Sequence, residues 1–367
     1  MKRSLLLALG MLATLGSLPA QPANEPVDFQ KARQLFERRQ RGESLTDAEK
    51  SYLEAALTAR RAAGNGKPVP NQRPAPAHLT PLCDLTAADR YEGEDGGLYG
   101  GGRNTPPETH RRAAGEQLAR IRPLNPNGEP DEDGVIGFVA LSMSNATQEF
   151  SRFKQLADAS PLKSPKVRIV DCAQGGQAMA EWAPANARPW DEAKRRLAAA
   201  GVSPQQVQVA WIKLANKAPA GSLQEHGRKL ERDTLAMLHN ARSLFPNLRI
   251  AYLGSRTYGG YANGPLNPEP YAYESAFPAR WLIQRQISDD PELAEAKSPL
   301  LLWGPYLWAD GVRGRKLDGL VWDRSDFGPD GVHPSDPGRG KVARRLLNFL
   351  STDALARPWF SGRAAGR

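Results

Sequence analysis

The sequence predicts an α/β protein in which helices cover both faces of a mostly parallel sheet of about five strands. Three observations carry this prediction. Short apolar runs recur between residues 135 and 303, helical segments separate them, and Gly, Pro, Asn and Asp bound them. Such alternation favours parallel strands joined by right-handed helical crossovers. Hydrophobic residues make up 40% and charged residues 24% of the 367 positions, as in a globular protein.

The first strand is expected within residues 135–141, a continuous apolar run of the kind that is buried on both faces of a sheet. The pattern places the other strands at 167–170, 207–212, 249–253 and 300–303. Helices are expected at 146–159, from 178 to the Pro184 region, at 223–244, at 273–286 and at 340–350. Residues 82–133 are predicted to be loop, because Gly is dense at 96–102 and two Pro follow.

The N-terminus has the pattern of a secretory signal peptide over residues 1–20. Lys2 and Arg3 precede an apolar run at 5–18, and Ala20 is a small residue at a plausible cleavage point. The run is short for a membrane span, and no later stretch is long and apolar enough to be one. We therefore expect an exported protein, periplasmic or extracellular, with no transmembrane segment after the signal peptide.

Residues 28–63 are expected to form a helical hairpin with a break near 41–47. Thr46 and Glu49 have the spacing of a capping box that opens the second helix. An apolar seam is predicted from Leu35, Phe36, Leu45, Tyr52, Leu53 and Leu57. A Pro- and Gly-rich linker at 64–81 separates this hairpin, whose protein partner is unknown, from the main domain at 82–353.

The net charge of +9 comes from Lys and Arg scattered among Asp and Glu, which favours a solvated surface over a nucleic-acid partner. No cofactor or metal motif is present: the two Cys are too few ligands for a metal, and the Gly-rich stretch lacks the strand and Lys of a phosphate loop. For Cys83 and Cys172 we predict a disulfide, because an oxidising compartment favours pairing, with two separate buried thiols as the alternative.

Two segments far apart in the sequence carry groups suited to nucleophilic catalysis. Asp330 and His333 are three positions apart just before the last helix, so the carboxylate can orient the imidazole while the other ring nitrogen faces a hydroxyl. Ser144 or Ser142 follows the first strand where a helix opens, and helix capping is the alternative role for either. Parallel strands bring such residues to one edge of the sheet.

The order of these residues resembles that of SGNH (GDSL-type) hydrolases over about residues 135–350. The most specific segment is Asp330-Gly-Val-His-Pro-Ser335. The resemblance implies a three-layer α/β/α fold with a flavodoxin-like sheet and no cofactor. It also implies that Ser144 is the nucleophile, His333 the base and Asp330 the acid that orients the base. The implied oxyanion hole consists of the Ser144 amide, the Gly176 amide and the Asn216 side chain. Gly175 is an alternative to Gly176.

The sequence departs from the family pattern at two places. The nucleophile block is usually Gly-Asp-Ser and is here Ser142-Met143-Ser144. The block around Asn216 is usually Gly-x-Asn-Asp and is here Leu214-Ala-Asn-Lys217. Neither change removes a triad residue, but both mark a divergent member of the family.

Four residues are candidates for substrate binding. Arg256 follows the fourth strand and suits a carboxylate or hydroxyl group, Tyr258 or Tyr261 can stack on a sugar, and Asn145 lies beside the nucleophile. The alternative for the tyrosines is a loop packed by its own aromatic residues. Glu149 is expected to have a capping or surface role.

The resemblance predicts an exported serine esterase that removes acetyl or similar groups from a carbohydrate, since exported members of the family often act on polysaccharide esters. A lipid esterase, or another small ester as substrate, is an alternative. So are a non-catalytic carbohydrate-binding protein that retains the fold, and an adaptor that recruits a partner through the helical hairpin.

Overall fold

The computed structural model describes residues 28–40, 44–64, 73–74 and 76–362, so the predicted signal peptide lies outside the described residues. The chain forms two compact units, Met1–Gly66 and Lys67–Arg367. The first contains α1 (Phe29–Gln40) and α2 (Asp47–Gly64), which bury Leu35, Leu45 and Leu53 against each other. Glu49 accepts a hydrogen bond from the Thr46 amide at 2.8 Å, and the Glu49 amide donates to Thr46 Oγ1 at 3.2 Å.

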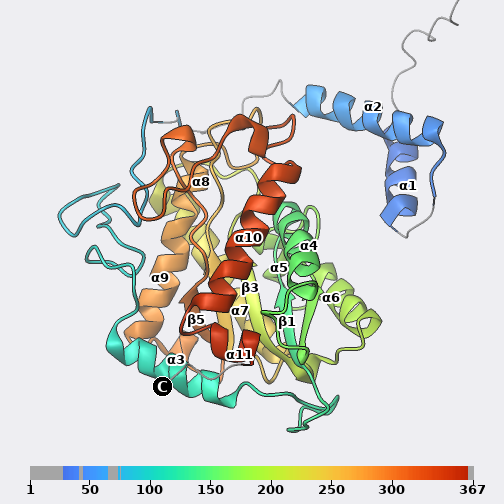
Figure 1. The fold of residues 1–367 in the computed structure, drawn as a ribbon. Coiled ribbons are helices and arrows are strands. Elements are labelled where there is room, and N and C mark those ends of the chain that lie inside the picture. The colour runs from blue at the N-terminus through green and yellow to red at the C-terminus, as the bar shows by residue number, and fades with distance from the viewer. Residues whose placement is uncertain (1–27, 41–43, 65–72, 75, 363–367) are drawn as a thin grey trace, which may run out of the picture. The chain divides into compact units, whose positions relative to one another are not determined.

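The second unit is built on a sheet of five strands, all parallel, in the order β2-β1-β3-β4-β5 (Figure 1). The strands are β1 (Ile136–Ala140), β2 (Val167–Asp171), β3 (Val207–Lys213), β4 (Ile250–Gly254) and β5 (Leu300–Trp303). This is the flavodoxin-like order, in which the chain reverses direction across the sheet between β1 and β3. The predicted fold class is confirmed.

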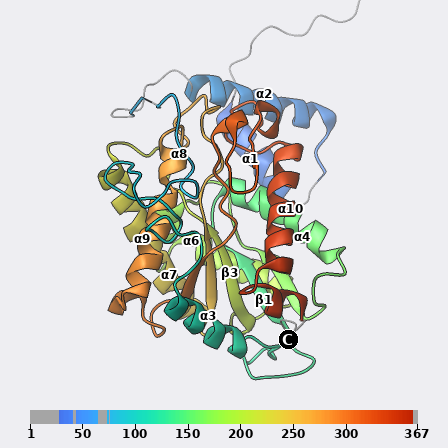
Figure 2. The same cartoon turned by 60° about the vertical axis from the view of Figure 1, so that its left-hand side comes forward.

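Alternate residues of the strands enter two hydrophobic clusters, one on each face of the sheet. Phe138 and Ala140 belong to the cluster under α4 (Ser144–Asp158), α10 (Asp336–Thr352) and α11 (Arg357–Ser361). Val139 and Leu141 belong to the cluster on the opposite face. That face is covered by α5 (Met179–Trp182), α6 (Arg188–Ala199), α7 (Arg228–Leu244) and α9 (Ala276–Ile287), as Figures 1 and 2 show. Burial on both faces explains why the strands read as continuous apolar runs.

Several helices differ from the sequence prediction. A helix, α3 (Glu108–Arg120), lies within the segment predicted to be loop, and α6 was missed. Pro107 and Pro189 stand at the starts of these helices, where proline is compatible with helical geometry. In a sequence, proline also indicates loops, which is why these helices were not predicted. The helix predicted at 273–286 is divided into α8 (Tyr271–Glu274) and α9, and a π-helical turn at Leu223–Gly227 precedes α7. Short 3-10 turns lie at Pro204–Gln206, Pro291–Leu293, Gly311–Arg313 and Arg324–Asp326.

The predicted disulfide is wrong, because Cys83 and Cys172 are separate buried thiols. The Cys172 sulfur contacts the Ala193 carbonyl of α6 at 3.8 Å, whereas the Cys83 sulfur lies 3.7 Å from Asp84. Burial raises the pKa of the Cys83 thiol to about 12 and that of Cys172 well above its usual range. Both thiols are therefore protonated and unreactive at neutral pH.

Among the helices that the structure describes, none is long and apolar enough to cross a bilayer.

Candidate active site

Ser144, His333 and Asp330 meet at the carboxyl edge of the sheet. Ser144 is the first residue of α4, and His333 lies three residues before α10, which packs against α4. Ser144 Oγ is 2.8 Å from His333 Nε2, and His333 Nδ1 is 2.6 Å from Asp330 Oδ2. The three groups form one continuous hydrogen-bond chain, although 189 positions separate Ser144 from His333 in the sequence.

The loop before α10 holds the Asp330 carboxylate in an ionised state. Burial acts to raise its pKa, but the hydrogen bond and charge of His333 and the backbone amides of Val332 and His333 outweigh burial, so the pKa is lowered. The two amides donate to Asp330 Oδ1 at 3.1 and 3.0 Å. An ionised carboxylate accepts only, so His333 Nδ1 donates to it and Nε2 is left to accept a proton from Ser144.

Gly331 is required by the shape of this loop. Its φ of +68° lies in the left-handed region, and a Cβ at this position would fall 1.6 Å from the Tyr261 carbonyl oxygen. No side chain fits such a contact. The glycine therefore lets the loop pass close to the segment that follows β4.

The structure distinguishes the two candidate serines. Ser142 is fully buried, and its hydroxyl donates to the Lys213 carbonyl at 2.5 Å. Ser144 is partly accessible and faces His333. Ser142 thus joins the end of β1 to the end of β3, while the Ser144 hydroxyl contacts the His333 imidazole.

Asn145 does not face a substrate site, contrary to expectation. The residue is 2% exposed, and its side-chain amide donates to the Val332 carbonyl at 2.7 Å. The bond ties the first turn of α4 to the loop that carries His333. Asn145 therefore fixes the distance between Ser144 and His333.

Backbone amides near Ser144 supply donors for a negatively charged oxygen. The Ser144 amide is at the first position of a helix, where no intrahelical acceptor exists. Gly175 and Gly176 border open space, and the φ of Gly176 is +76°. None of these three amides donates a hydrogen bond to another residue within the described part of the chain.

The Asn216 side chain is held between α5 and α7. Its Oδ1 accepts from the Ala180 amide at 2.9 Å, and its Nδ2 donates to Asp233. One of its two amide hydrogens is therefore already used. Asn216 lies three residues beyond Lys213, the last residue of β3 that pairs with β4, and so lies on the predicted rim. Its observed partners are helical residues and not Ser144.

Arg256, a candidate for substrate binding, is buried against Met143. It is 4% exposed, and one terminal nitrogen lies 3.6 Å from Met143 Sδ. Its Nε has no hydrogen-bond partner among the residues that the structure describes. Burial lowers the pKa of this guanidinium.

Tyr258 and Tyr261 pack against each other edge to face, with ring centroids 5.1 Å apart. The Tyr261 hydroxyl donates to the Trp322 carbonyl at 3.1 Å, and Tyr258 also contacts Trp308. Both tyrosines are half-buried and contact Trp308 or Trp322 outside their own loop, so the stacking of a sugar on either ring stays a prediction.

A buried ion pair between α4 and the end of β3 was missed by the sequence reasoning. Lys213 Nζ lies 2.7 and 2.8 Å from the two carboxylate oxygens of Glu149, and both side chains are 0% exposed. Glu149 is therefore neither a cap nor a surface residue. The available signal was a Lys at the end of the apolar run of β3, where a buried charge needs a partner.

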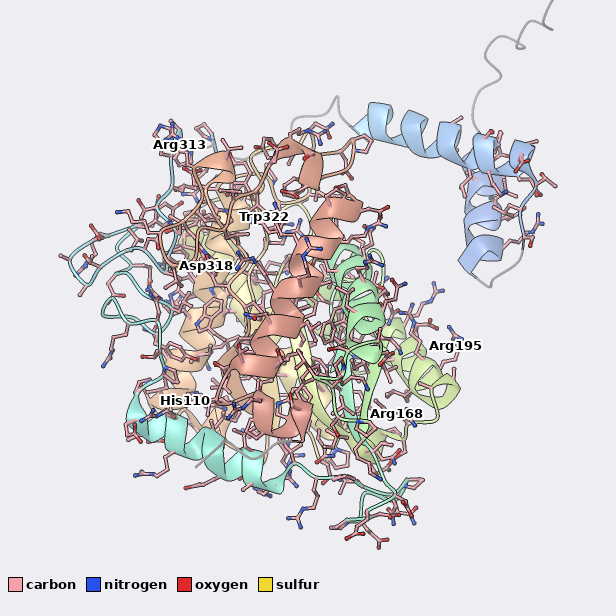
Figure 3. All side chains as sticks on the ribbon, viewed as in Figure 1. His110, Arg168, Arg195, Arg313, Asp318 and Trp322 are labelled. Atoms are coloured by element: carbon pink, nitrogen blue, oxygen red, sulfur yellow. The ribbon has the colours of Figure 1, made fainter. Side chains whose placement is uncertain are left out.

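Three other histidines, His110, His239 and His226, have other partners. His110, labelled in Figure 3, bonds to the Leu301 carbonyl of β5 at 2.8 Å, and His239 bonds to the Glu292 carbonyl at 2.7 Å. His226 bonds to Glu274. Within the described residues, His333 is the imidazole that contacts a serine hydroxyl.

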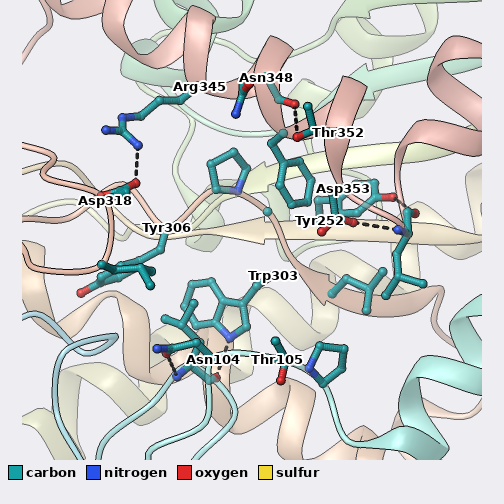
Figure 4. A pocket seen from close by; sticks show the side chains of 18 of the residues that line it. Asn104, Thr105, Tyr252, Trp303, Tyr306, Asp318, Arg345, Asn348, Thr352 and Asp353 are labelled. Carbon is teal, nitrogen blue, oxygen red and sulfur yellow. Dashed lines mark hydrogen bonds and ion pairs between the residues drawn. The ribbon is translucent and has the colours of Figure 1, made fainter.

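A cavity of about 670 Å³ lies away from Ser144, His333 and Asp330, none of which lines it. It lies beside the edge strand β5 and along α10, and Figure 4 shows Trp303, Tyr306 and Arg345 among its lining residues. Arg345 is paired there with Asp318 at 2.6 Å. The cavity is thus separate from the Ser144–His333 contact.

Comparison with known proteins gives similarity in structure only. No family model matches the sequence, and no curated protein matches it. One similar structure is a proposed SGNH hydrolase from Slackia heliotrinireducens, 17% identical, with a TM-score of 0.31, covering 59% of this chain and 100% of that one. A proposed acylhydrolase from Bacteroides fragilis is 12% identical, with a TM-score of 0.33, covering 67% and 96%. The periplasmic domain of a lipopolysaccharide acetyltransferase from Salmonella Paratyphi A is 13% identical, with a TM-score of 0.33, covering 66% and 96%.

Proposed function

We propose that this protein is an SGNH-type serine esterase in which Ser144 is the nucleophile, His333 the base and Asp330 the residue that orients it. The observation that carries the proposal is the continuous chain from Ser144 Oγ through the imidazole to the Asp330 carboxylate, with contacts of 2.8 and 2.6 Å. These contacts are within the reach that proton transfer requires. A serine that only capped α4 would have no need of an oriented imidazole.

The reaction would proceed through an acyl-enzyme. Ser144 Oγ attacks the ester carbonyl carbon while its proton passes to His333 Nε2, and the carbonyl oxygen becomes an oxyanion. When the intermediate collapses, the ester C–O bond breaks and the imidazolium gives its proton to the departing alcohol. Water then attacks the acyl-enzyme, with His333 as base again, and releases the carboxylic acid and the Ser144 hydroxyl.

Backbone amides are the best supported oxyanion donors. The Ser144 amide stands at the N-terminus of α4, where the helix dipole also favours negative charge. The Gly176 amide is the second donor, with Gly175 as its neighbour in the same open loop. Asn216 can contribute only the amide hydrogen that Asp233 does not accept.

The substrate is proposed to be an acylated, in particular acetylated, carbohydrate outside the cytoplasm. The signal-peptide pattern of residues 1–20 supports export, and the family resemblance supports a polysaccharide ester. A lipid ester needs a large apolar acyl site, so a fall in activity from acetyl to longer acyl chains would favour the carbohydrate ester.

Hydrolysis of p-nitrophenyl acetate tests the proposal. We expect Ser144→Ala and His333→Ala each to lower kcat by about 10⁴-fold or more. Ser142→Ala is the matched control: its hydroxyl is occupied by the Lys213 carbonyl, so turnover is retained at a stability cost of about 1 kcal/mol. Full activity in Ser144→Ala, or loss only in Ser142→Ala, would overturn the assignment.

Fluorophosphonate labelling separates an esterase from a carbohydrate-binding protein that has kept the fold. The reagent forms a covalent bond with an activated serine, so we expect one label, on Ser144, detected by mass spectrometry of the peptide. Absence of labelling in the folded wild-type protein would favour the non-catalytic alternative.

A further inference from the structure

A second cavity, of about 400 Å³, lies on the side of Asn216 that faces α5, the start of α7 and α8. Its volume is within the range of small-molecule sites. We propose that this cavity binds one neutral sugar ring of the substrate, an inference that rests on the proposed function and identifies a subsite for it. The lining residues are Ala180, Glu181, Asn216, Lys217, Ala218, Pro219, Ala220, Glu225, His226, Lys229, Leu230, Asn267 and Tyr271.

The charges around this cavity are balanced, which selects against an ionic ligand. Two lysines and two glutamates line it. Lys217 is paired with Glu181 at 2.8 Å, and Lys229 is paired with Asp233 at 2.6 Å. An added carboxylate or ammonium would meet charges that already have partners. The hydroxyl groups of a neutral ligand can instead form hydrogen bonds with the lone pairs and hydrogens that the paired side chains still offer.

One wall of the cavity is apolar. Ala218, Pro219 and Ala220 follow Lys217 in the chain, and Leu230 of α7 also lines the cavity. A sugar ring presents C–H groups on its faces and hydroxyls at its edge. The combination of an apolar wall and polar amides, Asn216 and Asn267 among them, matches that amphipathic shape.

His226 provides a polar group with a fixed orientation. Its Nε2 lies 2.5 Å from the fully buried Glu274 carboxylate, which also accepts from Arg73 and from the Tyr91 hydroxyl. Burial acts to raise the pKa of Glu274, but these three bonds outweigh it and the pKa is lowered, so the group is an anion.

Because an anion only accepts, His226 Nε2 carries the hydrogen in the bond to Glu274. Nδ1 has no hydrogen-bond partner among the residues that the structure describes. A hydroxyl group of a sugar, which both donates and accepts, can bond to this second ring nitrogen.

The backbone around the cavity is held in sparsely populated conformations. Ala218 and Asn267 have positive φ values of 43° and 57°, and His226 lies in the π-helical turn before α7. The Asn267 side chain donates to the Asn216 carbonyl at 2.8 Å and so joins two walls. Strained backbone and π-helical turns occur preferentially at functional sites, because the surrounding structure must maintain them.

Ligand-observed NMR on the full protein tests the subsite without any need for turnover. The probes are cellobiose and xylobiose as neutral sugars and digalacturonate as a charged counterpart. We expect a neutral disaccharide to bind the wild type and Ser144→Ala equally, and Ala220→Phe and His226→Ala to weaken that binding by about tenfold. Ala220→Phe fills the cavity without removing a hydrogen bond, so it remains informative if His226→Ala fails to fold. Arg195→Ala, on the exposed face of α6 (Figure 3), is the matched control and should bind as the wild type does.

Three results would overturn the subsite: no binding of either neutral sugar to the wild type at about 50 mM, undiminished binding in Ala220→Phe, or tighter binding of digalacturonate than of the neutral sugars. If the wild type bound a neutral sugar but did not hydrolyse a small ester, that result would count against the proposed esterase and not against the subsite. Turnover of a small ester without sugar binding would count against the subsite alone.

Discussion

The buried ion pair between Lys213 and Glu149 gives a stability effect whose size can be worked out from the structure. Glu149→Gln removes the negative charge and leaves the Lys213 ammonium in a site with 0% exposure, next to the buried Arg256 guanidinium. Removal of one partner of a buried pair typically costs about 3–5 kcal/mol, out of a total stability of about 5–15 kcal/mol. We expect a cost in that range at pH 7.

Lys213 can also lose its proton in the folded variant. The free energy of that deprotonation sets an upper limit to the loss of stability and makes the loss depend on pH. Even with Glu149 present, burial lowers the pKa of Lys213 from 10.5 to about 8. In Glu149→Gln the folded protein can release the proton, at a cost of about 1.36 kcal/mol per pH unit below the unfolded-state pKa of 10.5. The limit is therefore about 5 kcal/mol at pH 7 and about 2 kcal/mol at pH 9.

The sign follows from linkage: between the folded and unfolded pKa values of Lys213 the unfolded chain binds more protons, so the stability of the variant rises with pH. Unfolding of the wild type and of Glu149→Gln by guanidinium chloride at pH 7 and pH 9 measures this change in stability. The double variant Lys213→Met/Glu149→Leu removes both charges and is expected to lie within about 2 kcal/mol of the wild type. A cost for Glu149→Gln below about 1 kcal/mol, or an equal cost at both pH values, would refute this reasoning.

Three further predictions concern the loop that carries His333. Asp330→Asn should keep the fold but lower kcat for p-nitrophenyl acetate by about 10³–10⁴-fold, because a neutral amide no longer fixes the imidazole tautomer; a loss below tenfold would count against the orienting role. Asn145→Ala removes the bond to the Val332 carbonyl, and we expect kcat to fall by about 10²-fold with little change in KM, measured by steady-state kinetics; an unchanged kcat would contradict it. Gly331→Ala should lower the free energy of unfolding by more than about 2 kcal/mol, measured by chemical denaturation, because its Cβ meets the Tyr261 carbonyl and φ is +68°; near-wild-type stability would be inconsistent with this geometry.

The parts of the site that could be read from the sequence depend on short-range patterns. Asp330 and His333 are three residues apart, so a single turn brings the carboxylate to the imidazole whatever surrounds it. The strands were located because each is buried on both faces and therefore apolar throughout. The helices α3 and α6 were missed because a proline stands at the start of each, and proline also ends helices.

The other features depend on contacts between residues distant in sequence. The sequence left Ser142 as an alternative to Ser144, and the pairing of Ser142 with the Lys213 carbonyl distinguishes the two serines. The burial of Arg256 follows from its packing under Met143, 113 positions away. The predicted disulfide failed for the same reason, since compartment and cysteine count say nothing of where the two sulfur atoms lie.

The sequence by itself determined the fold class and the residues that can serve as nucleophile, base and acid, because hydrophobic periodicity and local spacing are properties of contiguous segments. Only the tertiary structure decided which serine faces His333. It also decided that the buried charges of Lys213 and Glu149 pair with each other, and that a cavity with balanced charges adjoins Asn216. Those outcomes depend on distances across the sheet edge, which are fixed when strands and helices from separate parts of the chain pack together.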